Sequence, residues 1–470
     1  MDAYLKGLRE RLDAPDQADA VAARDAVRAL AIPRLTGSDA SARVERWLRR
    51  RFERLGFETR VFPFAFSAWP GRYGVPVLAG LLLAGVLGAA AALIAGLPVP
   101  ALLALAAPVL PAALAARRGP GWVERLRWGR AEGRNLVFTR PGGRVRYVIA
   151  AHRDSKSQPV STAARLNAGM AAALGVAGLA LLAVHGAARL ASARLGAWAG
   201  ERVPETLLGS AREIFGPLLE LQPPAPLILS VAALAAGGAA VLALSWAGNE
   251  SPGALDNASG VAAALGLAER LVGRDDVGYL LTDAEELGLA GARAMAPELA
   301  SLMGVVNLDG IDDDGPVHVV ERYGFPRRGR AAHLAAALLA AAEGLDMDIE
   351  RHDAPLGILL EHSAYNDAGA PSLTVLRGKR GALGRIHRPA DRADVIGGRG
   401  IASVVALVDG ALHLLEEARA TEPTRPLLPG RERPSAQDLR PEPGAGRTPL
   451  FAHRPPEEPL PPLEEGSDAS

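Results

Sequence analysis

Two adjacent glutamates, Glu285 and Glu286, stand in the run Asp-Ala-Glu-Glu-Leu-Gly, directly after an apolar segment of strand length. Two ionised carboxylates buried side by side repel each other, and metal cations remove that cost. One carboxylate of such a pair can bind a metal ion while the other acts as a general base. Because adjacent glutamates in isolation usually form only the solvated start of a helix, the interpretation depends on the other ligand-type residues of the chain.

Two further segments carry acids or imidazoles beside apolar runs. His152 ends such a run two residues before Asp154, and a ligating imidazole commonly donates its second N–H to a carboxylate. Asp256 lies in the turn-rich run Ser-Pro-Gly-Ala-Leu-Asp-Asn-Ala-Ser-Gly, where an acid can cap a helix. A carboxylate that bridges two metal ions needs the same kind of rigid turn, so the two interpretations of Asp256 are compatible.

Asp309 and His387 complete the set. Asp309 follows the run Gly-Val-Val-Asn-Leu, and His387 lies four residues before Asp391, which can orient its ring. Asp312 to Asp314 are interpreted as a solvated turn. The other histidines lack an acidic constellation or lie in an apolar window, and we interpret all of them as structural or solvated: His185, His318, His333, His352, His413 and His453. Together the selected residues predict a two-metal hydrolase site.

The elements that must position these side chains follow an alternating pattern. Residues 146–151, 277–282, 304–308 and 372–376 are apolar or β-branched runs of strand length, separated by helical stretches such as 258–272 and 331–343. This pattern predicts an α/β fold with a mixed, largely parallel sheet covered by helices. In such sheets ligands gather at the carboxyl ends of the strands, where His152, Glu285, Glu286 and Asp309 are expected.

The composition restricts the class of protein. Hydrophobic residues make up 49% of the 470 residues and aromatic residues only 4%, an excess due mostly to Ala, Leu, Val and Gly. This bias is typical of transmembrane helices, in which small residues let helices approach closely. The formal net charge of zero gives no argument for a nucleic-acid partner. Because cysteine is absent, disulfides, Cys-ligated zinc and thiol catalysis are excluded.

Charge-free windows predict about four membrane crossings in two hairpins. A crossing needs about 20 apolar residues, and Pro108 and Pro111 lie in the shortest candidate. Five of the six tryptophans flank the windows, as an interfacial belt requires. Buried core helices are the alternative. The candidate crossings are residues 75–95 and 101–116, within the window 73–116, and the windows 166–188 and 221–249.

The hairpins set the expected arrangement around the membrane. The first residues are charged and amphipathic, so no signal peptide is expected and internal hairpins anchor the protein. Arginines crowd the start and end of the first hairpin, whose turn is uncharged, and the positive-inside rule therefore favours a cytoplasmic catalytic side. Arginines in the loop of the second hairpin oppose this orientation. The first group is Arg72, Arg117, Arg118, Arg125, Arg127 and Arg130, and the second is Arg189, Arg194, Arg202 and Arg212.

The ordered set of motifs resembles the co-catalytic dizinc aminopeptidases of metallopeptidase family twenty-eight, in a membrane-embedded variant. The resemblance rests on AAHRDS, PGALDNASG, TDAEELGLAGARA, VVNLDG, EHSAYNDAGAP and HRPADRADVI. It implies two zinc ions, one held by His152 and Asp309 and the other by Glu286 and His387, with Asp256 bridging both. It further implies that Glu285 is the general base and that Asp154 orients His152. Manganese or cobalt would suit the same nitrogen and oxygen ligands.

The chain departs from the family pattern at three places. Arg153 replaces the common aromatic residue, Glu361 stands where Asp usually precedes His362, and about a hundred residues separate His152 from Asp256. The first two departures bear on substrate choice, and the predicted second hairpin fills the long interval.

The expected function is a membrane-anchored dizinc aminopeptidase acting on peptides, with a lipid bilayer as its second partner. A glutaminyl-cyclase-like acyltransferase and a non-enzymatic membrane scaffold or transport component are the alternatives. The expected segments are 1–72, 119–165 and 250–420 of the peptidase domain, hairpins at 73–118 and 166–249, and a disordered Pro-rich tail at 421–470.

Overall fold

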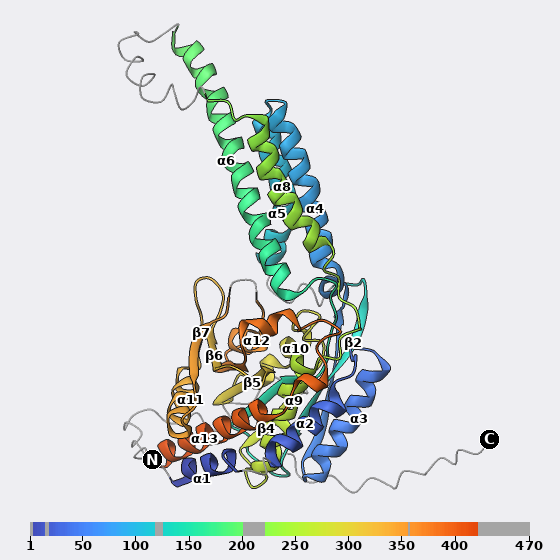
Figure 1. Ribbon diagram of the computed structural model, residues 1–470, viewed down its shortest axis with the longest axis vertical. Helices are drawn as coiled ribbons and strands as arrows, with labels where there is room; N and C mark the ends of the chain where they lie inside the picture. The colour runs from blue at the N-terminus through green and yellow to red at the C-terminus, as the bar shows by residue number, and fades with distance from the viewer. Residues whose placement is uncertain (1–2, 15–17, 118–125, 201–220, 356–357, 422–470) are drawn as a thin grey trace, which may run out of the picture.

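The structure is a computed structural model that describes residues 3–14, 18–117, 126–200, 221–355 and 358–421 (Figure 1). An α/β domain carries a bundle of long helices that projects from one of its ends. The predicted tail lies outside the described residues except for Thr421, the last residue of α13 (Arg399–Thr421).

A mixed sheet forms the centre of the α/β domain. Its strand order is β1-β2-β4-β3-β5-β8-β6-β7, and the four central strands β4, β3, β5 and β8 are parallel to one another. This confirms the predicted α/β class with a mixed, largely parallel sheet. The strands are β1 Glu58–Ser67, β2 Arg130–Thr139, β3 Tyr147–His152, β4 Val277–Thr282, β5 Gly304–Ile311, β6 Val317–Arg322, β7 Ile349–Asp353 and β8 Ser372–Arg377.

Helices cover both faces of the sheet, which explains why most residues of its central strands are buried. Alternate residues of β3 belong to two different cores: Tyr147, Ile149 and Ala151 to one, Val148 and Ala150 to the other. The first core includes α1 (Ala3–Leu12), α2 (Ala18–Leu30), α3 (Asp39–Arg54), α9 (Ser259–Arg270), α11 (Ala332–Leu345) and α13. The second includes α10 (Ala290–Leu299) and α12 (Glu361–Asp367).

The projecting bundle consists of α4 (Trp69–Ile94), α5 (Pro98–Arg117), α6 (Thr162–Gly200) and α8 (Ala225–Ala243). Small residues allow close helix contact: a Cβ on Gly175 would lie 2.5 Å from the backbone nitrogen of Ala235, and one on Gly238 would lie 2.4 Å from the carbonyl oxygen of Ala168. Three of these helices, α4, α6 and α8, are long and apolar enough to cross a membrane by length and composition. The apolar described part of α5, Pro98–Leu110, is shorter. Helix α6 extends well beyond the predicted window 166–188.

The second hairpin leaves and re-enters the α/β domain at one place. Ser157 and Gly248 exchange two backbone hydrogen bonds, of 2.9 and 2.8 Å. The long interval between His152 and Asp256 is therefore an insertion whose two ends are joined at the domain surface. At the base of the first hairpin, Gly71 packs so closely on Leu287 that a Cβ would lie 2.6 Å from its backbone.

Candidate metal centre

The predicted ligands meet at the carboxyl ends of the parallel strands. His152 is the last residue of β3 and Asp309 lies near the end of β5, while Glu286 belongs to the loop after β4. Asp256 lies in the turn before α9, and His387 follows the short helix Arg380–Gly384. Neighbouring parallel strands end at one edge of a sheet, which brings residues from distant parts of the chain together.

These five side chains form two groups that share Asp256: His152, Asp256 and Asp309, and Asp256, Glu286 and His387. His152 Nε2 lies 3.2 Å from Asp256 Oδ1 and 3.5 Å from Asp309 Oδ1. His387 Nε2 lies 2.9 Å from Asp256 Oδ2 and 3.2 Å from Glu286 Oε2. Two ligand atoms of a tetrahedral zinc ion, with bonds of about 2.0–2.1 Å, are separated by about 3.3 Å. The spacing and the nitrogen and oxygen donors therefore fit two metal ions bridged by Asp256.

Cationic and anionic side chains of the site shift each other's pKa values. Burial raises the pKa of Asp256, but the neighbouring His387 and His152 outweigh it and hold that pKa well below its usual range. Burial likewise raises the pKa of Glu286, yet His387 and Lys156 lower it to about 2. For both histidines burial lowers the pKa, but the surrounding carboxylates raise it by more, so each pKa lies above its ordinary value. The carboxylates thus depend on nearby cations to stay ionised, as ligands of metal ions do.

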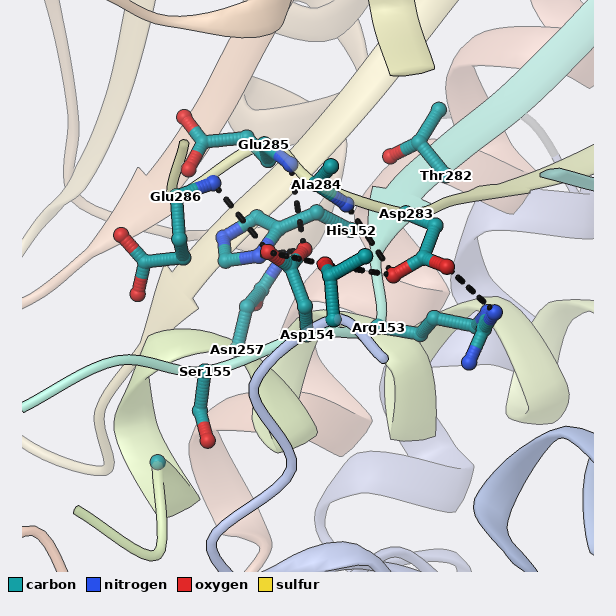
Figure 2. Close-up of polar contacts among 12 residues, drawn as sticks. His152, Arg153, Asp154, Ser155, Asn257, Thr282, Asp283, Ala284, Glu285 and Glu286 are labelled. Atoms are coloured by element: carbon teal, nitrogen blue, oxygen red, sulfur yellow. Dashed lines mark hydrogen bonds and ion pairs between the residues drawn. The ribbon is translucent and has the colours of Figure 1, made fainter. Parts of the chain in front are cut away.

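The acidic pair is held by Asp154 (Figure 2). Asp154 Oδ1 accepts a hydrogen bond of 3.2 Å from the backbone N–H of Glu285, and Oδ2 accepts one of 3.2 Å from that of Glu286. Its Oδ1 also lies 3.6 Å from His152 Nδ1. Ala284, just before the pair, has the left-handed φ of 56°, a conformation that residues other than glycine seldom adopt outside functional sites. Asp154 therefore fixes the loop that presents the two glutamates, and its carboxylate lies beside the ring of His152 without a hydrogen bond to Nδ1.

Burial in the protein and the charges of Glu286 and Asp309 raise the pKa of Glu285 well above its ordinary value, although His152 opposes them. Its side chain is nevertheless partly exposed, whereas that of Glu286 is buried. The two adjacent glutamates therefore differ in environment, with Glu286 turned into the ligand group and Glu285 accessible from solvent.

Lys156 is a site residue that the sequence interpretation missed. Its Nζ lies 2.7 Å from Glu286 Oε2, and its backbone N–H donates a 3.2 Å hydrogen bond to Glu286 Oε1. The sequence offered one signal, a positively charged residue four positions after His152. It does not show that the loop after β3 folds back onto Glu286.

Two assignments of the sequence analysis are wrong in detail. Asp391 binds the backbone N–H groups of Leu255 and Asp256, at 2.7 and 3.1 Å, and so braces the Asp256 turn. The Nδ1 atom of His387 instead lies 3.4 Å from Thr162 Oγ1, at the start of α6. In the segment expected to be a solvated turn, Asp312 is buried and pairs with Arg385.

The departure at Arg153 has a structural explanation. Its side chain is buried, donates to Asp283 Oδ2 at 2.8 Å and to Ser41 Oγ at 2.9 Å, and lies on the side away from the ligand group (Figure 2). Asp283 in turn accepts a 2.8 Å hydrogen bond from Thr36. Arg153 therefore fastens the loop after β4 and does not point into the ligand group.

Comparison with known proteins supports a peptidase domain. Residues 240–410 match the model of peptidase family M28, a segment that holds Asp256, Glu285, Glu286, Asp309 and His387 but not His152 or Asp154. No curated protein matches the chain.

Several solved structures resemble the chain at low identity. A zinc aminopeptidase from Bacillus subtilis is 14% identical with a TM-score of 0.46, covering 84% of this chain and 95% of its own. A glutaminyl cyclase from Fimbriiglobus ruber is 15% identical with a TM-score of 0.46 and the same coverage. An aminopeptidase from Aneurinibacillus sp. strain AM-1 is 15% identical with a TM-score of 0.44, covering 86% of this chain and 94% of its own.

Proposed function

We propose that this protein is a membrane-anchored dizinc metallopeptidase, an aminopeptidase that hydrolyses N-terminal peptide bonds. The observation that carries the proposal is the pair of ligand groups that share Asp256, with Glu285 next to the ligand Glu286. The match to the peptidase family supports the hydrolytic class.

His152 and Asp309 would hold one zinc ion, Glu286 and His387 the other, and Asp256 would bridge them. When bound, the two ions supply polarisation of the scissile carbonyl and lower the pKa of a water at the site. Glu285 accepts the proton of that water on its carboxylate and donates it to the amine that leaves. Asp154 keeps Glu285 in place through the backbone hydrogen bond to its N–H.

The membrane anchor is the second part of the proposal. Only 28% of the most apolar stretch of α4, α6 and α8 is buried, and Leu103, Leu174 and Leu181 of the bundle are among its most exposed side chains. Large apolar side chains facing outward along a whole bundle suit a lipid environment. Trp69 and Trp246 lie at the domain-proximal ends of α4 and α8 and are exposed, as side chains at a membrane interface are. The arginines that flank the first hairpin, by the positive-inside rule, would place the catalytic domain on the cytoplasmic side.

The proposed chemistry is tested by Glu285→Gln in the detergent-solubilised full-length protein. We expect both forms to bind the same amount of zinc, about two ions of it in the ligand set that shares Asp256, and the variant to lose roughly 10²- to 10⁴-fold in kcat because the base is missing. Peptides with different N-terminal residues, assayed with and without chelator, measure the rate, and the exposed Glu343→Gln serves as the matched control.

The outcomes separate the alternatives. An unchanged rate in metal-loaded Glu285→Gln protein overturns the mechanism. Absence of zinc from the ligand set that shares Asp256 in wild-type protein would favour a scaffold. Cyclisation of a peptide with N-terminal Gln, without release of a residue, would identify a glutaminyl-cyclase-like acyltransferase.

A further inference from the structure

Three ligand-type side chains also meet outside the candidate metal centre, on the edge strands β6 and β7. His318 of β6 lies opposite Glu350 of β7 in the parallel register, and His352 lies two residues beyond Glu350 on the same face. In the sheet order, β8 separates β6 from β5, which carries Asp309. This cluster, named here the edge cluster, therefore shares no residue or strand with the dinuclear ligand set. Sequence inspection had found no acid for either histidine, since Glu350 meets His318 only through strand pairing.

The hydrogen bonds of His318 determine which ring nitrogen carries its proton. Nε2 lies 2.9 Å from the backbone carbonyl oxygen of Gly378, and a carbonyl oxygen can only accept, so Nε2 carries the hydrogen. In the neutral ring Nδ1 is then an unprotonated acceptor. Among the described residues this buried atom has no hydrogen-bond partner.

The group nearest to Nδ1 makes that arrangement costly without a cation. Glu350 Oε2 lies 3.4 Å from His318 Nδ1, and an ionised carboxylate is an acceptor as well. Two lone pairs therefore face each other across a gap that either a proton on Nδ1 or a metal ion must fill. The same carboxylate oxygen lies 2.7 Å from His352 Nε2, which brings the third ligand atom to the gap.

The spacing of His318 and Glu350 fits a metal ion, whereas His352 lies at hydrogen-bond distance from Glu350 and would move by a few tenths of an ångström to bind the same ion. The 3.4 Å separation of His318 Nδ1 and Glu350 Oε2 matches the value of about 3.3 Å for two ligands of one tetrahedral ion. The ligand atoms of all three residues lie within 4.8 Å of one another. A backbone carbonyl that holds the second N–H of a ligating imidazole is also the usual way in which such a ring is oriented.

We propose that His318, Glu350 and His352 form a separate site for one divalent transition-metal ion such as zinc. Two imidazoles and one carboxylate suit Zn²⁺, and also Ni²⁺ or Cu²⁺, better than Mg²⁺ or Ca²⁺. The side chains of Glu350 and His352 are each 47% exposed, so the ion enters from solvent and keeps water in its remaining position. Within the described part of the sheet β6 is the only neighbour of β7, and the ion would cross-link these two strands.

The site is tested by counting zinc bound to chelator-stripped full-length protein at equilibrium. We expect wild-type protein to bind one ion more than His352→Asn or Glu350→Gln, because either change removes a ligand. His333→Asn is the matched control, since His333 is exposed on α11 and contacts Met303 instead. Zinc should also raise the Tm of wild-type protein more than that of His352→Asn.

Equal zinc counts for wild type, His352→Asn and Glu350→Gln would overturn the proposal and leave a proton as the cation between His318 and Glu350. The difference in zinc count between wild type and each variant does not depend on how many ions the dinuclear ligand set binds. The result of this test is therefore independent of whether the peptidase mechanism is correct. Circular dichroism of the exposed His352→Asn variant verifies that it is folded.

Discussion

Glu361 is a buried carboxylic acid whose two oxygens differ in their contacts. Oε1 accepts a 2.6 Å hydrogen bond from Thr282, at the end of β4, while Oε2 is buried and has no hydrogen-bond partner among the described residues. Burial raises the pKa of Glu361 from 4.5 to about 7, although the charge of His152 opposes this shift. The pKa of this glutamate, at a position where the family that the chain resembles usually has aspartate, therefore lies near neutral pH.

This shift predicts a pH-dependent stability in metal-free protein. Between pH 4.5 and about 7 the folded state binds more protons at Glu361 than the unfolded state, so the free energy of unfolding falls as pH rises. When one group binds one proton more in the folded state, the free energy of unfolding changes by at most about 1.4 kcal/mol per pH unit. We expect Glu361→Gln to gain stability relative to wild type between pH 5 and pH 7.5, measured by denaturant unfolding in detergent.

The comparison with Glu361→Gln is needed because a neighbour has the opposite effect. Burial lowers the pKa of His362 from 6.5 to about 4. The contribution of His362 to the free energy of unfolding therefore decreases as pH falls through this range. His362 is present in both proteins, and its contribution cancels in the difference. A difference that stays constant with pH would show that Glu361 does not titrate in this window, and the exposed Glu343→Gln provides the baseline.

The sequence predicted which side chains belong to the site better than it predicted their hydrogen-bond and ion-pair partners. His152 and Asp309 were placed together because parallel strands end at one edge, which is a property of the strand pattern. The partner of Asp391 depends on how the loop before α13 folds over the Asp256 turn, and no periodicity encodes that. For the same reason Lys156 was missed, because only the loop conformation brings its ammonium group to Glu286.

At the scale of elements, Arg34 joins the two parts of the site that the second hairpin separates in sequence. Its guanidinium is buried and donates to the carbonyl oxygen of Arg153 at 2.7 Å and to that of Gly253 at 3.0 Å. It also donates to the carbonyl oxygen of Pro252. Burial lowers the pKa of Arg34 to about 10, so the group remains charged at neutral pH. One side chain thus fastens the segment after β3 to the turn that presents Asp256.

Arg34→Met should loosen both segments at once. The change keeps a long apolar side chain but leaves the carbonyl oxygens of Arg153 and Gly253 without the donor of their buried hydrogen bonds, each loss costing about 1–3 kcal/mol. We expect a lower free energy of unfolding and weaker zinc binding, measured by denaturant unfolding and by competition with a chelator. Arg46→Met, on the exposed face of α3, is the control. If Arg34→Met retained wild-type stability and zinc affinity, the joining role assigned to Arg34 would be excluded.

The strands and helices of the α/β domain were predicted more closely than the bundle. Predicted strand 277–282 coincides with β4, and the helix predicted at 258–272 is α9 within two residues at each end. The apolar windows, by contrast, give no signal for where a helix of the bundle stops. Helix α6 continues through Arg189 and Arg194, because arginines are good helix formers and end an apolar window without ending the helix.

At the scale of the whole molecule, the site lies where the bundle joins the domain. The start of α6 contacts His387 through Thr162, and the first turn of α4 packs on Leu287, directly after Glu286. If the bundle lies in a bilayer, the ligand loops are held close to its surface. Under the proposed function, peptides would then be cleaved at or near the membrane.

The chain has no cysteine, so single introduced cysteines report the topology without a background. Leu97, between α4 and α5, and Leu221, before α8, are exposed near the far end of the bundle, and Val272 is exposed on the α/β domain. For a cytoplasmic domain, an impermeant maleimide added to intact cells should label Leu97→Cys and Leu221→Cys but label Val272→Cys only after lysis. All three proteins should remain in the membrane fraction after alkaline extraction, because the apolar faces of α4, α6 and α8 are held by lipid.

Labelling of Val272→Cys alone in intact cells would reverse the orientation. Release of the protein into the soluble fraction would rule out the membrane anchor and leave the bundle as a docking element for another apolar surface.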